Sequence, residues 1–271
     1  MVRRIRALLL AAGLGTRLRP LTDHWPKCLM PVGERPLLEY WLQTACALGI
    51  DDVLVNTHFH ANLVETFLQR ERFADWVISV HEDKLLGTAG TLRANADFFR
   101  GLTTLLVHAD NWCQCDFVAF KNYHLNHRPA KCLITMMTFD TDAPQSCGIV
   151  ETDRDNVVVG FHEKVVAPPG KRANAAVYLL EPELIEWLES HPNLTDFSTE
   201  VLPRFIGRIA TWHNREIHRD IGTLASLKDA QFDPIPEPIW TETDNWQKEF
   251  QTIPFISQLR DNILLTNGVS P

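Results

Sequence analysis

The fold is decided by the stretch Leu9-Leu10-Ala11-Ala12-Gly13-Leu14-Gly15-Thr16-Arg17-Leu18. Here an apolar run, typical of a buried strand, opens into a loop with two glycines and an arginine. Glycine lets the backbone turn tightly and present its N–H groups to an anion, and the arginine adds a bidentate phosphate donor. A phosphate loop directly after a first strand indicates an α/β protein whose ligand lies at the carboxyl ends of the strands.

Two familiar glycine motifs do not fit this loop. A dinucleotide fingerprint G-x-G-x-x-G would need glycine at Leu18, and no acidic residue ends the second expected strand. A Walker loop, G-x-x-x-x-G-K-[ST], is absent. Taken alone, G-x-G-T-R is as compatible with a structural turn as with a phosphate site.

Outward from the loop, short β-rich runs alternate with helical patterns through the first 140 residues. We expect a Rossmann-like, open, twisted α/β sheet, mixed but mostly parallel and flanked by helices. The predicted strands are Arg6–Ala11, Asp52–Thr57, Trp76–His81, Thr103–Ala109 and Cys132–Thr138. The predicted helices are Pro36–Leu48, Ala61–Arg70 and Thr88–Phe99.

After residue 140 the pattern changes and predicts a smaller β lobe on the same sheet. We expect a hairpin of Gly148–Glu151 and Val157–Phe161, a strand at Ala173–Leu180, and helices at Glu183–Ser190 and Thr223–Gln231. The predicted organisation is one domain over residues 1–232, with halves 1–140 and 141–232. A Pro-rich, then polar appendage covers residues 233–271.

The charge and composition exclude several classes of partner. The net charge is −8, so the field of the molecule would repel nucleic acid. No apolar run approaches the roughly 18 residues of a membrane span, and we expect no membrane partner. The apolar run after Met1–Arg6 imitates a signal peptide, but it is short and leads into the glycine loop, so we predict a cytoplasmic protein.

The cysteines and histidines suggest neither disulfides nor zinc. The six cysteines lie mostly in apolar runs without C-x-x-C spacing, which favours free thiols in a reducing compartment. Four histidines that might be considered as ligands lack partners at zinc-like spacing and are interpreted as surface or loop residues. They are His58, His60, His124 and His127.

A second block begins nine residues after Arg17, Pro26-Lys27-Cys28-Leu29-Met30-Pro31-Val32-Gly33-Glu34-Arg35-Pro36-Leu37. With the glycine loop, it resembles the signature of the sugar-1-phosphate nucleotidyltransferase, or nucleotide-sugar pyrophosphorylase, family. The turn Leu86-Gly87-Thr88-Ala89-Gly90 is most similar to the branch of mannose-1-phosphate and heptose-1-phosphate guanylyltransferases. The resemblance implies a GT-A-like nucleotidyltransferase fold, with a nucleotide-binding half (1–140) and a sugar-binding half (141–232).

The resemblance also implies residue roles on the nucleotide side. Arg17 and Lys27 would be catalytic, acting on the charge of the reacting phosphates. Gly87 and Thr88 would lie against the nucleobase. The alternative role of Thr88 is a helix N-cap, and the two roles can hold together. The residues implied to bind the nucleotide are Leu10, Ala11, Ala12, Gly13, Gly15, Thr16, Arg17, Gly87 and Thr88.

The metal and sugar residues follow from the same resemblance. Asp110 and Asp220 would bind Mg²⁺, with an N-cap as the alternative role for Asp220. The residues implied to bind the sugar phosphate are Asp110, Glu163, Lys164 and Asn174. The family usually has glycine where Ala109 and Ala176 stand. The change at Ala109 should not affect the metal ligand, whereas the change at Ala176 bears on the fit of the sugar.

The implied reaction joins a nucleoside triphosphate to a sugar 1-phosphate and releases pyrophosphate, with Mg²⁺ as cofactor. GTP with a mannose-like sugar is favoured, and a uridylyl- or thymidylyltransferase is the alternative. A metal-dependent glycosyltransferase would need a second acid where Asn111 and Trp112 follow Asp110. A catalytically silent nucleotide-sugar sensor need not retain all of these residues. A homo-oligomer is left open.

Overall fold

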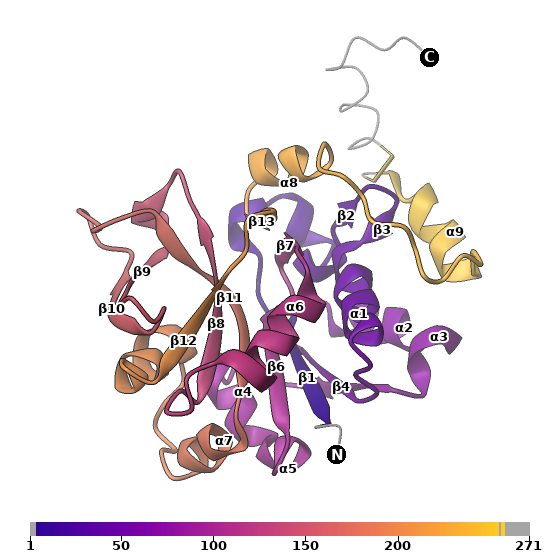
Figure 1. The fold of residues 1–271 in the computed structure, drawn as a ribbon. Helices are drawn as coiled ribbons and strands as arrows, with labels where there is room; N and C mark the ends of the chain where they lie inside the picture. Colours follow the sequence, from indigo (N-terminus) through magenta and orange to yellow (C-terminus); the bar gives the residue numbers. More distant parts are fainter. Residues whose placement is uncertain (1–3, 255, 258–271) are drawn as a thin grey trace.

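A computed structural model describes residues 4–254, 256 and 257 of the chain. A central sheet carries most of the strands, and two small ribbons are added to it (Figure 1). The strands are β1 (Ile5–Leu10), β2 (Pro31–Val32), β3 (Arg35–Pro36), β4 (Val53–Thr57), β5 (Val77–His81), β6 (Thr103–His108), β7 (Asn111–Gln114), β8 (Ile134–Asp140), β9 (Gly148–Thr152), β10 (Val158–Glu163), β11 (Arg172–Leu180), β12 (Ile209–His213) and β13 (Ile217–Asp220).

Helices lie on both faces of the sheet. The α-helices are α1 (Leu37–Ala47), α2 (Ala61–Leu68), α3 (Glu71–Ala74), α4 (Thr88–Ala94), α5 (Ala96–Phe99), α6 (Phe117–Asn122), α7 (Pro182–Glu189), α8 (Leu224–Ala230) and α9 (Asn245–Thr252). The short 3-10 and π turns are η1 (Thr16–Leu18), η2 (Leu21–Asp23), η3 (Lys27–Leu29), η4 (Tyr123–His127), η5 (Pro144–Ser146), η6 (Phe197–Val201) and η7 (Leu202–Phe205).

The sheet is mixed, as predicted. Strands run in the order β10-β9-β11-β6-β1-β4-β5, with β8 paired to β11 and β12 paired to β8. The half made of β6, β1, β4 and β5 is parallel, whereas β11 runs antiparallel to β6, β8 and β9. Since Leu10 is opposite both Asn56 and His108, the ends of β1, β4 and β6 meet at one edge.

Successive side chains of β1 point to opposite faces of the sheet and pack in two different hydrophobic cores. Leu9 packs in the core shared with α1, α2, α6 and α8, and Leu8 packs in the core shared with α4, α5 and α7. Both leucines are wholly buried. Because β1 is covered on both faces, its residues from Ala7 to Leu10 are all apolar, which explains the continuous run before the glycine loop.

Most predicted elements are confirmed. The five strands expected before residue 140 are present with ends shifted by at most two residues, and β9 and β10 form the expected antiparallel hairpin. In the hairpin turn, Oδ1 of Asp153 accepts hydrogen bonds from the backbone N–H groups of Asp155 and Val157, both at 2.9 Å.

Two predictions are wrong. The single helix expected over Thr88–Phe99 is broken at Asn95, where the side chain donates a 2.9 Å hydrogen bond to the carbonyl of Thr91 and the backbone leaves helical geometry. His124, predicted to be a surface or loop residue, is wholly buried, and its Nδ1 lies 2.8 Å from the Thr135 hydroxyl.

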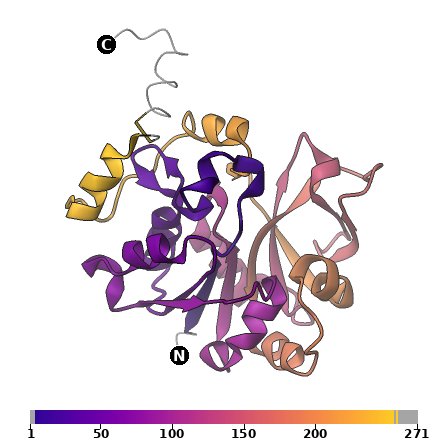
Figure 2. The same cartoon turned by 180° about the vertical axis from the view of Figure 1, so that it is seen from behind.

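The segment after residue 232 packs against the N-terminal half of the chain. Figures 1 and 2 show α9 beside α2 and α3 from both sides, and the rings of Trp246 and Phe67 stand 4.9 Å apart. Arg70 connects the two regions, because its guanidinium bonds both the buried Glu39 at 2.7 Å and Asp244 at 2.6 Å. Phe250 is 1% exposed. None of the described helices is long and apolar enough to cross a membrane.

Candidate active site

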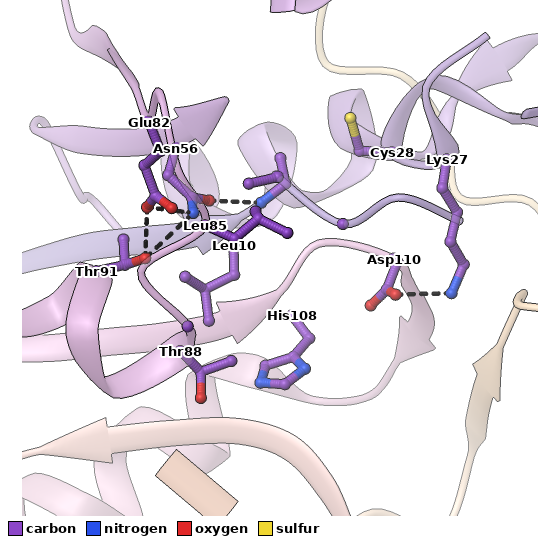
Figure 3. A pocket seen from close by; sticks show the side chains of 14 residues that line it. Leu10, Lys27, Cys28, Asn56, Glu82, Leu85, Thr88, Thr91, His108 and Asp110 are labelled. Atoms are coloured by element: carbon purple, nitrogen blue, oxygen red, sulfur yellow. Dashed lines mark hydrogen bonds and ion pairs between the residues drawn. The ribbon is translucent and has the colours of Figure 1, made fainter. Parts of the chain in front are cut away.

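A pocket of about 190 Å³ opens where β1, β4 and β6 end (Figure 3). One end is formed by the turn before α4, and the other by the start of η3 and the residue after β6. The lining residues are Leu10, Ala11, Ala12, Gly13, Lys27, Cys28, Asn56, Glu82, Leu85, Gly87, Thr88, Thr91, His108 and Asp110.

The glycine loop is fixed at its start and open further along. The backbone N–H of Ala11 donates to Oδ1 of Asn56 at 2.8 Å, which ties the end of β1 to β4. Gly13 lines the pocket and is exposed. Thr16 and Arg17, at the start of η1, are also exposed but lie beyond the lining. The loop therefore leads from the pocket to the charged residues beside it.

Four charged side chains meet at the mouth of the pocket. The ammonium of Lys27 lies 2.6 Å from a carboxylate oxygen of Asp110 and 2.6 Å from one of Asp220. The guanidinium of Arg17 lies 2.7 Å from the other oxygen of Asp220. Lys27 is almost buried, with 6% of its side chain exposed, whereas the carboxylates are more open. Two positive and two negative charges cancel, so the ligand-free cluster is neutral.

The contacts within this cluster shift the pKa values of Asp220 and Arg17. Burial alone would raise the pKa of Asp220, but the charges of Lys27 and Arg17 and the hydrogen bonds they donate outweigh it and lower that pKa. The hydrogen bond to Asp220 and its charge raise the pKa of Arg17. Asp220 is therefore ionised at neutral pH and available as an anionic ligand.

The β7–β13 ribbon brings the two aspartates together. Asp220 ends β13 and pairs with Asn111, the residue directly after Asp110. Gly222 leaves the space that the cluster needs, because a Cβ atom there would lie 2.7 Å from Nη2 of Arg17 and 2.8 Å from Oδ1 of Asp220. The N-cap of α8 is Thr223, whose hydroxyl accepts from the backbone of Ser226, so the alternative role of Asp220 as an N-cap is wrong.

Asp110 and Asp220 fit a divalent metal. Both carboxylates contact the ammonium group of Lys27. They are therefore close enough together for one small metal ion to reach both of them. Two carboxylates suit a hard ion that takes its remaining oxygen ligands from water or phosphate. Within residues 4–254, 256 and 257, no three His, Cys, Asp or Glu side chains gather as a complete metal site.

The pocket contains a buried polar network that the sequence analysis missed. One oxygen of Glu82 accepts hydrogen bonds from Asn56 at 2.9 Å and Thr91 at 2.5 Å, and the other accepts from the backbone of Leu86 at 2.9 Å. Asn56 in turn bonds Ala11. The network thus joins the glycine loop to the turn before α4. Its signal in the sequence was a polar side chain near the end of each of two adjacent parallel strands.

The turn before α4 is held by a distant segment. Gly87 has φ of 77°, and a Cβ atom there would lie 2.5 Å from the carbonyl oxygen of Thr195. The same carbonyl accepts from the backbone of Ala89 at 2.9 Å, and the Thr88 hydroxyl accepts from the backbone of Phe197 at 2.7 Å. The alternative in which Thr88 is the N-cap is wrong, because Gly87 occupies that position.

Two further residues line the pocket beside the charged cluster. Burial raises the pKa of Cys28 to about 12, so its thiol stays protonated at neutral pH. Burial also lowers the pKa of His108, at the end of β6, so its ring is neutral at neutral pH. Neither residue was proposed from the sequence.

Of the four residues expected to bind the sugar phosphate, Asp110 lines this pocket. The other three, Glu163, Lys164 and Asn174, lie on the antiparallel half outside its lining. Strand β10 ends at Glu163, whose carboxylate lies 3.4 Å from the ammonium of Lys164. Lys164 has φ of 49°, so the chain turns directly after β10. Asn174 donates to the hydroxyl of Tyr178 at 2.6 Å and accepts from the backbone of Ala176 at 3.0 Å.

The fold and the site together define an α/β protein of the open-sheet class, in which a glycine loop and paired carboxylates meet at the carboxyl edge of parallel strands. The chain belongs to the nucleotidyl transferase family, whose model matches residues 6–234. The resemblance of the glycine loop and the lysine block to this family is therefore confirmed.

Named relatives agree with this membership. The chain is 29% identical to the mannose-1-phosphate guanyltransferase of Candida albicans over 205 residues, 73% of this chain and 55% of that protein. It is 28% identical to the mannose-1-phosphate guanylyltransferase of Mycobacterium tuberculosis over 224 residues, 81% of this chain and 61% of that protein. The chain thus spans little more than half the length of these relatives.

A solved structure shares the fold. A Bacillus anthracis protein, provisionally described as a glucose-1-phosphate thymidylyltransferase and solved with a sucrose, superposes with a TM-score of 0.74 at 23% identity. The match covers 84% of this chain and 94% of that one. The predicted sheet flanked by helices is confirmed.

Proposed function

We propose that this chain is a sugar-1-phosphate nucleotidyltransferase, which makes a nucleotide sugar and pyrophosphate from a nucleoside triphosphate and a sugar 1-phosphate. The observation that carries the proposal is the ammonium of Lys27 held between Asp110 and Asp220 at the mouth of the pocket. Phosphoryl transfer depends mainly on positioning and on charge neutralisation, and this cluster supplies both kinds of charge. Family membership and the named relatives support the same reaction.

Each end of the pocket would hold a different part of the nucleotide. The nucleobase would lie against Leu85, Gly87 and Thr88, where apolar side chains and backbone meet. The triphosphate would follow the backbone of the glycine loop towards Arg17 and Lys27. The network of Asn56, Glu82 and Thr91 would keep the two ends at a fixed separation.

Asp110 and Asp220 would hold Mg²⁺. When bound, the ion would act as a Lewis acid on the phosphate oxygens and orient the leaving pyrophosphate. The sugar phosphate is already ionised at neutral pH, so the protein needs no general base. Lys27 and Arg17 would orient the triphosphate for in-line attack at the α-phosphorus and neutralise the charge that develops there.

The sugar 1-phosphate would bind on the antiparallel half. Glu163 would accept hydrogen bonds from sugar hydroxyls, Lys164 would meet the phosphate, and Asn174 would lie beside the sugar. GTP with a mannose-like sugar 1-phosphate is favoured by the names of the relatives. Uridylyl or thymidylyl transfer to another sugar is the alternative, and the name of the structural neighbour fits it. The free cysteines suit the reducing cytoplasm, where we place the protein. A homo-oligomer stays open.

The proposal is tested by mixing the purified chain with Mg²⁺, each of four nucleoside triphosphates and a panel of sugar 1-phosphates, and measuring pyrophosphate. We expect the largest release with GTP and mannose 1-phosphate, and none without a sugar phosphate. Asp220→Asn is the matched control, because it keeps the shape of the side chain and removes its charge. Pyrophosphate release that needs no sugar phosphate, or none with any pair, would contradict the proposal.

A further inference from the structure

The hydroxyl of Thr22 is buried against the glycine loop. Thr22 belongs to η2 and is 1% exposed, and its Oγ1 donates a hydrogen bond of 2.8 Å to the carbonyl oxygen of Gly15. The same oxygen accepts from the backbone N–H of Leu18 at 2.9 Å. A carbonyl oxygen has two lone pairs, so both acceptor positions at Gly15 are occupied and the direction of this carbonyl is fixed.

The peptide that joins Gly15 to Thr16 depends on this support. Gly15 has φ of 62°, and glycine adopts positive and negative φ about equally readily, so the residue does not fix the peptide by itself. The peptide is planar and trans, so the N–H of Thr16 points away from the Gly15 carbonyl and from Thr22. Thr16 is exposed, and in the part of the chain that the structure describes no backbone carbonyl accepts from this N–H. The N–H is therefore available to a phosphate oxygen.

Thr22 also packs the glycine loop beside Lys27. A Cβ atom at Gly15 would lie 2.8 Å from the methyl carbon of Thr22 and 3.3 Å from Cβ of Lys27, so these two side chains enclose the glycine. The ammonium of Lys27 is the group held between Asp110 and Asp220. Thr22 is buried and does not line the pocket, so any effect that it has on a nucleotide passes through the loop.

We propose that Thr22 is a positioning residue, whose hydroxyl holds the glycine loop in the shape that binds the triphosphate. The inference rests on the proposed function, because it takes the phosphates of the nucleotide to follow this loop. The hydrogen bond to Gly15 keeps the N–H of Thr16 turned outwards before the nucleotide arrives. A loop that is already ordered loses less conformational freedom on binding, so the phosphates are bound more tightly.

The test separates binding of the phosphates from binding of the nucleoside. GTP, UTP, dTTP and CTP and their monophosphates are titrated by calorimetry in the presence of Mg²⁺, and denaturant unfolding measures the stability of each variant. Thr22→Val and Thr22→Ala both remove the hydroxyl, with and without an apolar group in its place, and Thr22→Ser keeps it. Thr44→Val is the matched control, because the Thr44 hydroxyl donates to the carbonyl of Tyr40 at 2.9 Å on α1, outside the lining of the pocket.

For the triphosphate that the wild type binds best, we expect Thr22→Val and Thr22→Ala to raise Kd by about 10-fold and to change Kd of the monophosphate by less than about 2-fold. Thr22→Ser should restore most of the triphosphate affinity, and Thr44→Val should leave both constants unchanged. A merely structural role would lower the free energy of unfolding and weaken both ligands by the same factor. An unchanged ratio of the two constants in both hydroxyl-free variants, or an equal loss in Thr22→Ser, overturns the inference.

The two proposals can fail separately. If the hydroxyl-free variants lose triphosphate affinity selectively but no sugar phosphate yields pyrophosphate, the role of Thr22 stands and the proposed reaction fails. If the wild type releases pyrophosphate and the ratio of the two constants is unchanged in both variants, the reaction stands and the role of Thr22 fails. A wild-type protein that binds none of the four triphosphates overturns both.

Discussion

Asp233 accepts two hydrogen bonds from the guanidinium of Arg219, at 2.6 Å from Nε and 3.0 Å from Nη2. The same carboxylate accepts from Nε1 of Trp112 at 3.0 Å. Arg219 and Trp112 face each other in the β7–β13 ribbon, one pair away from the Asp220 and Asn111 pair. Asp233 therefore fastens both strands of the ribbon directly beside the carboxylates proposed to bind the metal.

Asp233→Ala should loosen the ribbon and misplace Asp110 against Asp220. We expect Mn²⁺, used as a paramagnetic probe, to bind more weakly, and kcat to fall by about 10-fold, because small displacements of positioning groups are costly in catalysis. Asp229→Ala is the matched control, since Asp229 is exposed and lies 3.9 Å from Arg219. Equal Mn²⁺ affinity in the two variants would contradict a positioning role for Asp233.

The fold was predictable where local pattern decides structure. The run before Gly13 is apolar at every position because β1 is covered on both faces, and that signal is local. The break at Asn95 was not predictable from helical spacing, because it depends on one side chain bonding the preceding turn. The burial of His124 depends on contact with β8, which periodicity does not report.

The site was only partly predictable for a related reason. Lys27 and Asp220 are 193 positions apart, and no spacing rule joins them, so only the family resemblance pointed to the pair. Asn56, Glu82 and Thr91 carry no motif, and their connection appears only when parallel strands align their ends. Asp233 follows the last predicted helix, and nothing in its local sequence indicates a contact with Arg219.

Lys27→Met should have opposite effects on catalysis and on metal binding. We expect kcat to fall by about 100- to 1000-fold with a smaller change in KM for the nucleotide, because the lost charge acts mainly on the transition state. In the ligand-free protein, however, Mn²⁺ should bind roughly 10-fold more tightly, since no ammonium then competes for Asp110 and Asp220. Weaker Mn²⁺ binding by Lys27→Met would show that the lysine supports the metal site instead of competing with it.

Phe250→Ala should lower the free energy of unfolding by about 3 kcal/mol, because a large buried ring is removed from its contacts with Trp25 and Trp246. Denaturant unfolding measures the change. Phe232→Ala is the control, since its ring is 54% exposed and its loss should cost little. A Phe250→Ala protein as stable as the control would show that α9 is dispensable to the fold.

The fold should lose stability in acid as the carboxylate of Glu181 becomes protonated. Burial alone would raise its pKa, but hydrogen bonds and charge from His124 and Arg128 outweigh it and lower the pKa to about 2. The protein therefore gains stability from ionised Glu181 above the unfolded-state pKa of about 4.5 and loses it as the pH falls towards 2.

Glu181→Gln tests this linkage. The difference in unfolding free energy between wild type and variant should be on the order of 2 kcal/mol at pH 7 and should shrink between pH 4.5 and 2. For Glu186→Gln, at an exposed position of α7, the difference in unfolding free energy from wild type should not change with pH over this range. A constant difference across this range would rule out Glu181 as the titrating group.

Glu163→Ala should affect the sugar substrate and spare the nucleotide. Glu163 ends β10 on the antiparallel half, outside the lining of the nucleotide pocket, and 24% of its side chain is exposed, so a ligand can reach it. If it accepts hydrogen bonds from sugar hydroxyls, its loss should raise the KM for the sugar 1-phosphate and reduce kcat/KM by roughly 10- to 100-fold, with little change in the KM for GTP. Glu151→Ala is the matched control, because that glutamate lies on the neighbouring strand and pairs with His162 at 2.7 Å. A Glu163→Ala enzyme that binds GTP poorly but keeps its affinity for the sugar phosphate would assign this end of β10 to the other substrate.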